Sequence, residues 1–332
     1  MVSGMDYGKV AGVDKPVSRI VFGTDRLRGR LLPWLPYRAR EQHAFSLLDQ
    51  AFELGCNTFD TARLYWDSER TLGAWLRERR NRDNVVIISK GCHPSLLSGS
   101  PRLSPADVTH DLHASLQALG TDSIDLYLLH YDHPAAQIEP IMERLNRHID
   151  EGKISAIGAS NWSHERIAKA NTIAAGRGLH PVSASSVQFS LVDWTRSLWP
   201  GAVTLGGAGQ RAAREWYAMH GLPVFAWSSL ARGFFSPHYE PAKPDRNRIS
   251  RRCSTYFGTE ANIQRRQRAT TFAREHRLTV AQVALAYVLC QPLDVFAVVG
   301  CKTVEKFAEN VGALSLTLDE ATLHWLATGH GR

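Results

Sequence analysis

Short apolar runs alternate with longer amphipathic segments along almost the whole chain. Each apolar run has the length of a strand, whereas apolar positions in the longer segments recur at three- and four-residue spacing, which predicts helices. Eight core strands are predicted, over 18–22, 58–60, 85–90, 124–130, 154–159, 185–188, 224–227 and 295–299. The predicted helices lie between and after them, over 41–54, 68–80, 105–119, 137–150, 163–177, 209–220, 260–276, 280–289, 304–313 and 319–328.

Short apolar strands that alternate with helices are typical of parallel strands buried on both faces. Eight such units predict an α/β fold, a closed (β/α)8 TIM barrel, as a single domain over residues 1–332. An open doubly wound sheet is the competing interpretation, but the sequence GTDRLRG after the first strand does not match its phosphate loop. Two additions are predicted: an N-terminal hairpin near 7–13, and a long loop over 232–259 after the seventh strand, which we interpret as a flap across the barrel mouth.

Polar residues end three successive predicted strands. Asp60 ends the second strand, Lys90 the third and His130 the fourth, and Tyr65 follows Asp60 in the next loop. Taken singly, each has an ordinary structural interpretation, as a cap, a strand-end solvent group, a packing ring or a core histidine. In a (β/α)8 barrel, however, the C-terminal ends of the strands share one face, where active sites lie. Their common position therefore predicts that they meet in one pocket.

These residues belong to an ordered set of short motifs. The chain has DTARLY at 60–65, LLH at 128–130, GASNW at 158–162 and GCK at 300–302. The set resembles the aldo-keto reductase family, whose members carry DTA-x-x-Y, a strand-end lysine and LLH in this order. The resemblance covers nearly the whole chain, and it implies reversible reduction of an aldehyde or ketone to an alcohol by a nicotinamide cofactor.

The resemblance implies four catalytic residues, Asp60, Tyr65, Lys90 and His130. A tyrosine hydroxyl is a weak acid at neutral pH, and a neighbouring ammonium makes it a better proton donor. Tyr65 is therefore the expected proton donor, and Lys90 is expected to tune it. Asp60 is expected to pair with Lys90, and His130 to orient the substrate carbonyl.

No side chain can supply a hydride, so a cofactor must supply it. The resemblance implies NADPH, with NADH as a less favoured option, and Lys302 and Lys306 would meet the 2′-phosphate as point charges. Trp227 is expected to stack on the nicotinamide, with a core tryptophan as the alternative. The remaining expected cofactor contacts are Thr24, Asp60, Ser160, Asn161, Gln188, Ser228, Leu230, Arg232, Gly233, Gly300, Glu309 and Asn310.

The expected substrate pocket is formed by Trp34, Tyr65, Trp66 and His130. The two tryptophans could favour flat or apolar carbonyl compounds, or could equally pack between loops. Two other functions stay open: a cofactor-binding regulatory subunit with little turnover on the same fold, and a barrel of different chemistry, such as a phosphate-binding isomerase or lyase.

Charge and composition indicate which other ligands the chain could bind. The net charge is +7 and the pI is near 9.3, with arginines clustered at 246–252 and 265–268. Few aromatic residues accompany them, so a solvated face is expected rather than nucleic-acid binding, with some attraction for a phosphorylated cofactor. No metal site is expected, because the neighbouring histidine and cysteine residues lack a third ligand.

The chain has no apolar run that approaches the roughly 20 residues of a membrane span, and its N-terminus lacks a signal-peptide pattern. The five cysteines are scattered and without paired spacing, which predicts reduced thiols. A cytoplasmic protein without a membrane segment is expected. The sequence leaves the oligomeric state open.

Overall fold

The computed structural model describes residues 4–25, 27 and 37–331, with the backbone alone for 37–40. In the described residues, eight strands form a closed barrel in the order β10-β3-β4-β5-β6-β7-β8-β9. The strands are β3 (Ile20–Gly23), β4 (Thr58–Asp60), β5 (Val86–Gly91), β6 (Ile124–Leu129), β7 (Ile154–Ser160), β8 (Val182–Ser186), β9 (Val224–Trp227) and β10 (Val295–Val299). The pairings from β3 to β8, and between β9 and β10, are parallel. The predicted (β/α)8 TIM barrel is confirmed.

Contacts between residues divide the chain into two compact units. The N-terminal unit comprises Met5–Ser186 and Gly300–Lys306, and the C-terminal unit comprises Val187–Val299 and Phe307–Arg332 together with Met1–Gly4. Each unit is described by itself below.

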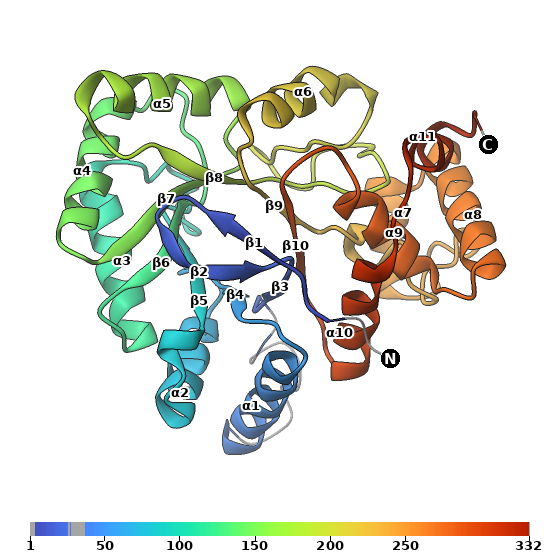
Figure 1. The fold of residues 1–332 in the computed structure, drawn as a ribbon, viewed down its shortest axis with the longest axis horizontal. Helices are drawn as coiled ribbons and strands as arrows, with labels where there is room; N and C mark the ends of the chain where they lie inside the picture. Colours follow the sequence, from blue (N-terminus) through green and yellow to red (C-terminus); the bar gives the residue numbers. More distant parts are fainter. Residues whose placement is uncertain (1–3, 26, 28–36, 332) are drawn as a thin grey trace. The chain divides into compact units, whose positions relative to one another are not determined.

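Helices of the N-terminal unit follow the strands in the predicted order. They are α1 (Tyr37–Glu53), α2 (Ser68–Arg79), η1 (Arg82–Asn84), α3 (Pro105–Leu119), α4 (Ile138–Asp150) and α5 (His164–Arg177). Helices α2 to α5 contact one another in succession, on the outer side of β5 to β7 (Figure 1). Local signals fix their ends: Ser104 and Asp107 form a capping box at the start of α3, and Gly120 ends it in a left-handed conformation.

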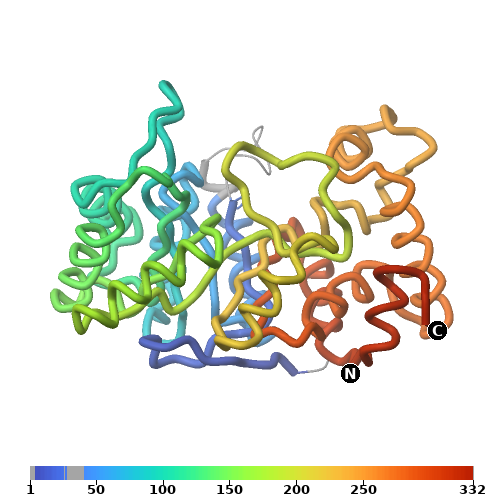
Figure 2. The backbone as a smooth tube through the Cα atoms, turned by 90° about the horizontal axis from the view of Figure 1, so that it is seen from above, coloured from blue at the N-terminus to red at the C-terminus, as the bar shows by residue number. Residues whose placement is uncertain are grey.

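The predicted N-terminal hairpin is also confirmed, as β1 (Tyr7–Val10) and β2 (Val13–Ser18). Its turn needs a glycine, because Gly12 has φ +86° and a Cβ there would lie 2.8 Å from the carbonyl oxygen of Ser155, at the start of β7. The Ser18 amide donates to Thr58 Oγ1, 3.0 Å away at the start of β4. The hairpin thus lies across the N-terminal ends of these strands (Figure 2) and leaves their C-terminal ends to form a site.

An ion cluster ties the hairpin to the same N-terminal ends. Lys15 Nζ lies 2.8 Å from Asp125 Oδ1 and donates to the Val85 carbonyl at 2.7 Å. Arg82 Nη2 lies 2.9 Å from Asp125 Oδ2, which also accepts from the Ile87 amide at 2.8 Å. We call Lys15, Arg82 and Asp125 the basal ion cluster. It joins β2, η1, β5 and β6.

The C-terminal unit contains β9, β10 and most of the later helices. These are η2 (Ala208–Gln210), α6 (Arg211–His220), η3 (Ala231–Gly233), α7 (Arg248–Phe257), α8 (Glu260–Glu275), α9 (Val280–Leu289), η4 (Gly312–Ser315) and α11 (Glu320–Thr328), while α10 (Val304–Val311) begins in the N-terminal unit. The predicted helices over 260–276, 280–289 and 319–328 correspond to α8, α9 and α11 within a few residues.

The prediction of one long loop over 232–259 is wrong for its second half, because α7 occupies Arg248–Phe257. Asn247 caps this helix, and only a narrow side that includes Cys253 and Phe257 is buried. Three arginines, Arg248, Arg251 and Arg252, lie among or before the apolar positions of the helix and hide its period in the sequence. In the first half, Phe234 is fully buried in the same core cluster as Phe257, so much of the segment is packed structure.

The arginines of α8 do not form a solvated face, which corrects that expectation. Arg266 is half-buried and donates to the carbonyls of Phe234 and Ser236 at 2.9 and 3.0 Å. Arg268 donates to the Leu326 carbonyl in the last turn of α11. These guanidinium groups complete backbone hydrogen bonding within the unit.

Candidate active site

The ends of β4 and β5 bring a carboxylate and an ammonium together. Lys90 Nζ lies 2.6 Å from Asp60 Oδ2 and also donates to the Thr61 carbonyl at 2.9 Å. Both side chains are about 95% buried, with 4% and 5% exposed. Burial raises the pKa of Asp60, and the positive charge of Lys90 opposes that rise. A pair this short and this dry holds the ammonium in one place.

The Tyr65 ring lies beside this pair. Its centroid is 5.0 Å from Lys90 Nζ and 6.0 Å from the centroid of the His130 ring, which meets it at 82°. Main-chain hydrogen bonds shape the turn that carries it: Arg63 N donates to Lys90 O, and Ser68 N donates to Tyr65 O. The structure therefore brings together the four side chains that the sequence placed at three strand ends.

His130 is buried and is held as a neutral ring. Burial lowers its pKa well below the usual value, and the positive charge of Lys90 adds to this effect. Nδ1 is buried and has no hydrogen-bond partner among the described residues. An N–H there would be an unpaired donor, so we assign the proton to Nε2. The His93 ring meets His130 edge-on at 5.2 Å, a neighbour that the sequence did not single out.

Ser160 and Asn161 lie at the end of β7, next to the end of β8. Asn161 has φ +58°, and its Nδ2 donates to the His130 carbonyl and to Ser160 Oγ, each at 3.1 Å. Its backbone amide donates to the Ser186 carbonyl at 3.0 Å. Asn161 thus joins three strand ends, β6, β7 and β8.

Ser186 is a candidate site residue that sequence reasoning missed. It pairs in register with Ser160, and its hydroxyl is buried without a partner among the described residues. The predicted strand ended at Gln188, two residues later than β8 does. The polar pair Ser185–Ser186 at the end of the strand was the signal that could have marked this position.

Gln188 lies in the C-terminal unit, and both polar atoms of its side-chain amide form hydrogen bonds with other side chains of this unit. Its Nε2 donates to Ser190 Oγ at 2.8 Å, and its Oε1 accepts from Thr204 Oγ1. The residue is fully buried. Its predicted role in binding the carboxamide stays a prediction, and it would require these two bonds to rearrange.

Trp227 ends β9 within a group of three tryptophans. Its ring stacks on Trp199 with centroids 4.8 Å apart and 19° between the planes, and Trp194 lies 6.1 Å away. The Arg232 guanidinium lies 5.6 Å from the centroid of Trp199. Ser228 and Arg232 have φ of +55° and +56°, so the 228–233 segment makes tight left-handed turns. Gly233, at φ +104°, and half-buried Leu230 complete it.

The remaining predicted cofactor contacts differ in exposure. In the N-terminal unit, Thr24 Oγ1 donates to the Asp60 carbonyl at 3.0 Å, and the side chains of Lys302 and Lys306 are exposed. A Cβ on Gly300 would lie 3.3 Å from Asp25 Oδ1. In the C-terminal unit, Glu309 is half-buried and Asn310 is buried.

The two predicted pocket tryptophans have different outcomes. Trp34 lies outside the described residues. Trp66 is described, and its side chain is 67% exposed at φ +54°. Trp66 is therefore not packed between loops within the part of the chain that the structure describes.

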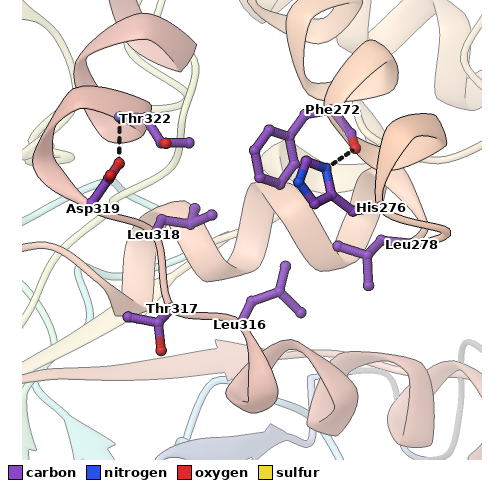
Figure 3. Close-up of a pocket in the computed structure, with 8 residues that line it drawn as sticks. All are labelled: Phe272, His276, Leu278, Leu316, Thr317, Leu318, Asp319 and Thr322. Carbon is purple, nitrogen blue, oxygen red and sulfur yellow. Dashed lines mark hydrogen bonds between the residues drawn. The ribbon is translucent and has the colours of Figure 1, made fainter. Parts of the chain in front are cut away.

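Three further observations concern metal binding, membrane helices and a second groove. Among the described residues, no group of three histidine, cysteine or acidic side chains is arranged to hold a metal. In the same part of the chain, no helix combines the length and apolar character that a membrane crossing requires. A groove of about 400 Å³ in the C-terminal unit, lined by Phe272, His276 and Leu316 among others, contains none of the predicted site residues (Figure 3).

Known proteins provide an independent comparison. Residues 19–326 match the profile of the aldo/keto reductase family. An NADP(+) aldo-keto reductase of Schizosaccharomyces pombe, yakc, is 29% identical over 286 residues, which cover 84% of this chain and 79% of the relative. An aryl-alcohol dehydrogenase from Pestalotiopsis microspora is 28% identical over 298 residues, which cover 87% and 73%. The crystal structure of the thermostable aldo-keto reductase Tm1743 with the inhibitor epalrestat has the same fold, with a TM-score of 0.71 over 97% of this chain and 99% of that chain at 22% identity.

Proposed function

Because the chain belongs to the aldo/keto reductase family, we propose that it uses NADPH to reduce an aldehyde or ketone, with the Tyr65 hydroxyl as the proton donor. Membership makes the protein an NAD(P)H-dependent oxidoreductase that acts on carbonyl compounds. The choice of NADPH and the role of each residue are our proposal.

One observation carries the proposal: the Lys90 ammonium lies 2.6 Å from Asp60 and 5.0 Å from the centre of the Tyr65 ring. A positive charge at this distance favours the phenolate that remains when Tyr65 gives up its proton. Asp60 holds the ammonium in place in a buried site. The effect of the pair is to make a weak acid a usable proton donor near neutral pH.

The neutral His130 ring completes the proton chemistry. With its proton on Nε2, the ring donates a hydrogen bond to the substrate oxygen and orients it toward Tyr65. Since burial and Lys90 keep the ring neutral, it positions the carbonyl without adding a second charge. The bound cofactor supplies the hydride.

A buried unpaired hydroxyl supports the cofactor site. Ser186 Oγ has no partner among the described residues, and it stands next to Ser160 and Asn161 at neighbouring strand ends. A carboxamide needs both donors and acceptors, and these three side chains offer them. We therefore assign Ser186 to the carboxamide site beside Ser160 and Asn161.

The preference for NADPH rests on two exposed lysines and on one relative. Lys302 and Lys306 extend into solvent near the start of α10, where a 2′-phosphate would gain two positive charges. The S. pombe relative carries NADP(+) in its name. We expect NADH to bind more weakly, because it lacks that phosphate.

We propose an aryl carbonyl compound as the preferred substrate. The rings of Tyr65, His93, His130 and Tyr131 contact one another edge-on or tilted at centroid distances between 4.9 and 6.0 Å. Such a wall favours a flat ring. The similarity to an aryl-alcohol dehydrogenase agrees with this choice.

The first test measures oxidation of NADPH with matched aldehydes, benzaldehyde and butyraldehyde, beside titration of NADPH by tryptophan fluorescence. Turnover of both, with the higher kcat/KM for benzaldehyde, supports the reductase and its substrate class. Equal kcat/KM values for the two aldehydes would contradict the aryl preference and leave the reductase proposal intact. Fluorescence quenching without turnover on either aldehyde or on ketones would contradict the reductase and favour a regulatory subunit.

We also propose a cytoplasmic location and a single barrel domain. All five cysteines are free thiols, as is usual in a reducing compartment. The family profile runs through both compact units, from residue 19 to residue 326.

A further inference from the structure

A buried carboxylate lies behind the Tyr65 turn. Glu69 is 1% exposed, and its Oε1 accepts a hydrogen bond from Ser89 Oγ at 2.7 Å. Oε2 is buried and makes no hydrogen bond of regular geometry among the described residues. Burial raises the pKa of Glu69, although the Ser115 hydroxyl on α3 lies close enough to lower it and so opposes that rise. Burial of an acid without full pairing is costly, so a carboxylate kept here has a reason beyond solubility.

The two residues of this hydrogen bond are each next to the proposed proton chemistry. Glu69 lies in the first turn of α2, four residues after Tyr65, and Ser89 directly precedes Lys90 on β5. Successive side chains of a strand point to opposite faces. Ser89 therefore points toward the helix layer, while Lys90 points to the opposite side, toward Asp60. The bond between Glu69 and Ser89 links the helix that follows Tyr65 to the strand that carries Lys90.

Hydrogen bonds within the turn (Tyr65 N to Ala62 O and Ser68 N to Tyr65 O) fix its shape, and two further bonds attach it to its neighbours. Arg63 N donates to Lys90 O at 2.9 Å on one side, and Ser68 Oγ donates to the Thr24 carbonyl at 2.6 Å on the other. Between them, Trp66 is exposed in a left-handed conformation and provides little packing. Within the described residues, Glu69 is the first side chain after Tyr65 that hydrogen-bonds to β5.

We propose that Glu69 is a positioning residue, which acts through Ser89 to keep the Tyr65 ring in its place 5.0 Å from the Lys90 ammonium. The inference rests on the proposed function of Tyr65 and Lys90. Without the bond, α2 is free to shift by a fraction of an ångström relative to β5. The distance between the phenol and the ammonium then increases, and the proton donor becomes weaker.

The experiment compares Ser89→Ala, Glu69→Met and Glu69→Gln. The first two remove the hydrogen bond, whereas Glu69→Gln keeps an acceptor oxygen of the same reach. We expect kcat for benzaldehyde to fall about tenfold or more in Ser89→Ala and Glu69→Met, and to stay within about threefold in Glu69→Gln. The Kd for NADPH should stay within about twofold in all three, since none of them changes a cofactor contact. Glu320→Met, an exposed acid in the first turn of α11, is the matched control and should leave kcat unchanged.

The pH dependence of kcat shows whether Glu69 positions Tyr65 or only stabilises the fold. Reduction requires a protonated Tyr65, so kcat falls as the pH rises through the pKa of that tyrosine. A phenol farther from Lys90 has a higher pKa, so the upper limb of the profile should move toward the usual tyrosine value, about 10, in Ser89→Ala. A lower midpoint of unfolding with unchanged kcat and an unchanged upper limb would overturn the proposal. If Glu69→Met does not fold, Ser89→Ala decides alone.

A second readout does not need turnover. Carbon-13 labelled tyrosine gives a signal for Tyr65 that Tyr65→Phe assigns, and its titration should move to higher pH in Ser89→Ala. An unmoved titration overturns the positioning role. A wild-type protein that binds NADPH and reduces no carbonyl compound instead overturns the proposed function, and the titration still tests the link between Glu69 and Tyr65.

Discussion

Two lysine–aspartate pairs lie at opposite ends of the strands in the N-terminal unit. At the N-terminal ends, Lys15 Nζ lies 2.8 Å from Asp125. At the C-terminal ends, Lys90 Nζ lies 2.6 Å from Asp60. Each pair joins separate strands, and neither geometry alone shows which one serves chemistry.

Their surroundings differ. Asp125 accepts hydrogen bonds on both oxygens, from Lys15 and from the Ile87 amide, and it also forms an ion pair with Arg82. Near Asp60 and Lys90, His130 Nδ1 and Ser186 Oγ are buried without partners among the described residues. Unpaired buried atoms also occur elsewhere, as at Asn81 Oδ1 beside Arg82, so it is the position of Asp60 and Lys90 at the C-terminal strand ends that favours a ligand site there. A charge pair therefore indicates a site only together with its place in the barrel.

The largest effect is expected from Tyr65→Phe. Removal of the hydroxyl takes away the proton donor, so kcat should fall by about 10²- to 10⁴-fold while NADPH still binds. Tyr7→Phe removes a hydroxyl that donates to the Gly55 carbonyl in the hairpin region, and it should leave kcat unchanged. Steady-state kinetics and fluorescence titration check both. Full turnover in Tyr65→Phe would remove Tyr65 as the acid.

A matched pair of substitutions, Asp60→Asn and Asp125→Asn, tests whether the two lysine–aspartate pairs have different roles. Asp60→Asn leaves a buried ammonium without a counter-charge, which should cost about 3–5 kcal/mol of unfolding free energy and most of the activity. Asp125→Asn affects partners that are 25% and 23% exposed, so about 1–2 kcal/mol is expected, with kcat retained. Denaturant unfolding and kinetics on both variants test this. Equal losses of activity would show that the basal ion cluster also supports the site.

A smaller effect is expected on the pH dependence of the unfolding free energy. The pKa of His130 is lowered in the folded protein, so below about pH 6.5 the unfolded chain binds a proton that the folded chain does not. Stability from this group is present above that pH and is lost as the pH falls. Between pH 7 and 5.5 the loss should be about 1 kcal/mol, and His130→Gln should remove it. Denaturant unfolding at the two pH values measures the difference, and identical differences in both proteins would contradict a neutral His130.

The sequence predicted the barrel because its signals are local. Apolar runs such as 85–90 and 124–130 and caps such as Ser104 repeat along the chain, and the structure confirms the elements they predict. It missed α7 because arginines separate the apolar positions of that helix. It also placed the end of β8 two residues late, since serines at 183, 185 and 186 weaken the apolar signal of that strand.

Tertiary partners were beyond sequence reasoning. Nothing in the chain indicates that Trp199 stacks on Trp227, or that Ser89 binds Glu69, because each pair comes from segments with no fixed spacing. The four residues that we predict to be catalytic lie close together for a different reason. Each of them stands at or just after a strand end, and barrel closure alone brings such positions to one face. The roles of these residues stay predictions.

The smallest expected effect is on the Kd for NADPH, and it is tested by substitutions at the two ends of β8. Ser186→Ala removes the unpaired hydroxyl at the end of β8 and should raise the Kd for NADPH by about two- to tenfold, which corresponds to one hydrogen bond. Ser183→Ala, near the start of the same strand, removes a hydroxyl that contacts only the nearby Pro181 carbonyl in the described contacts, and should leave the Kd unchanged. The 3-acetylpyridine analogue of the cofactor, which lacks the carboxamide NH2, refines the test: wild type should discriminate against it more strongly than Ser186→Ala does. Equal discrimination would move the carboxamide site away from Ser186 and return Gln188 as the candidate, at the cost of its bonds to Ser190 and Thr204.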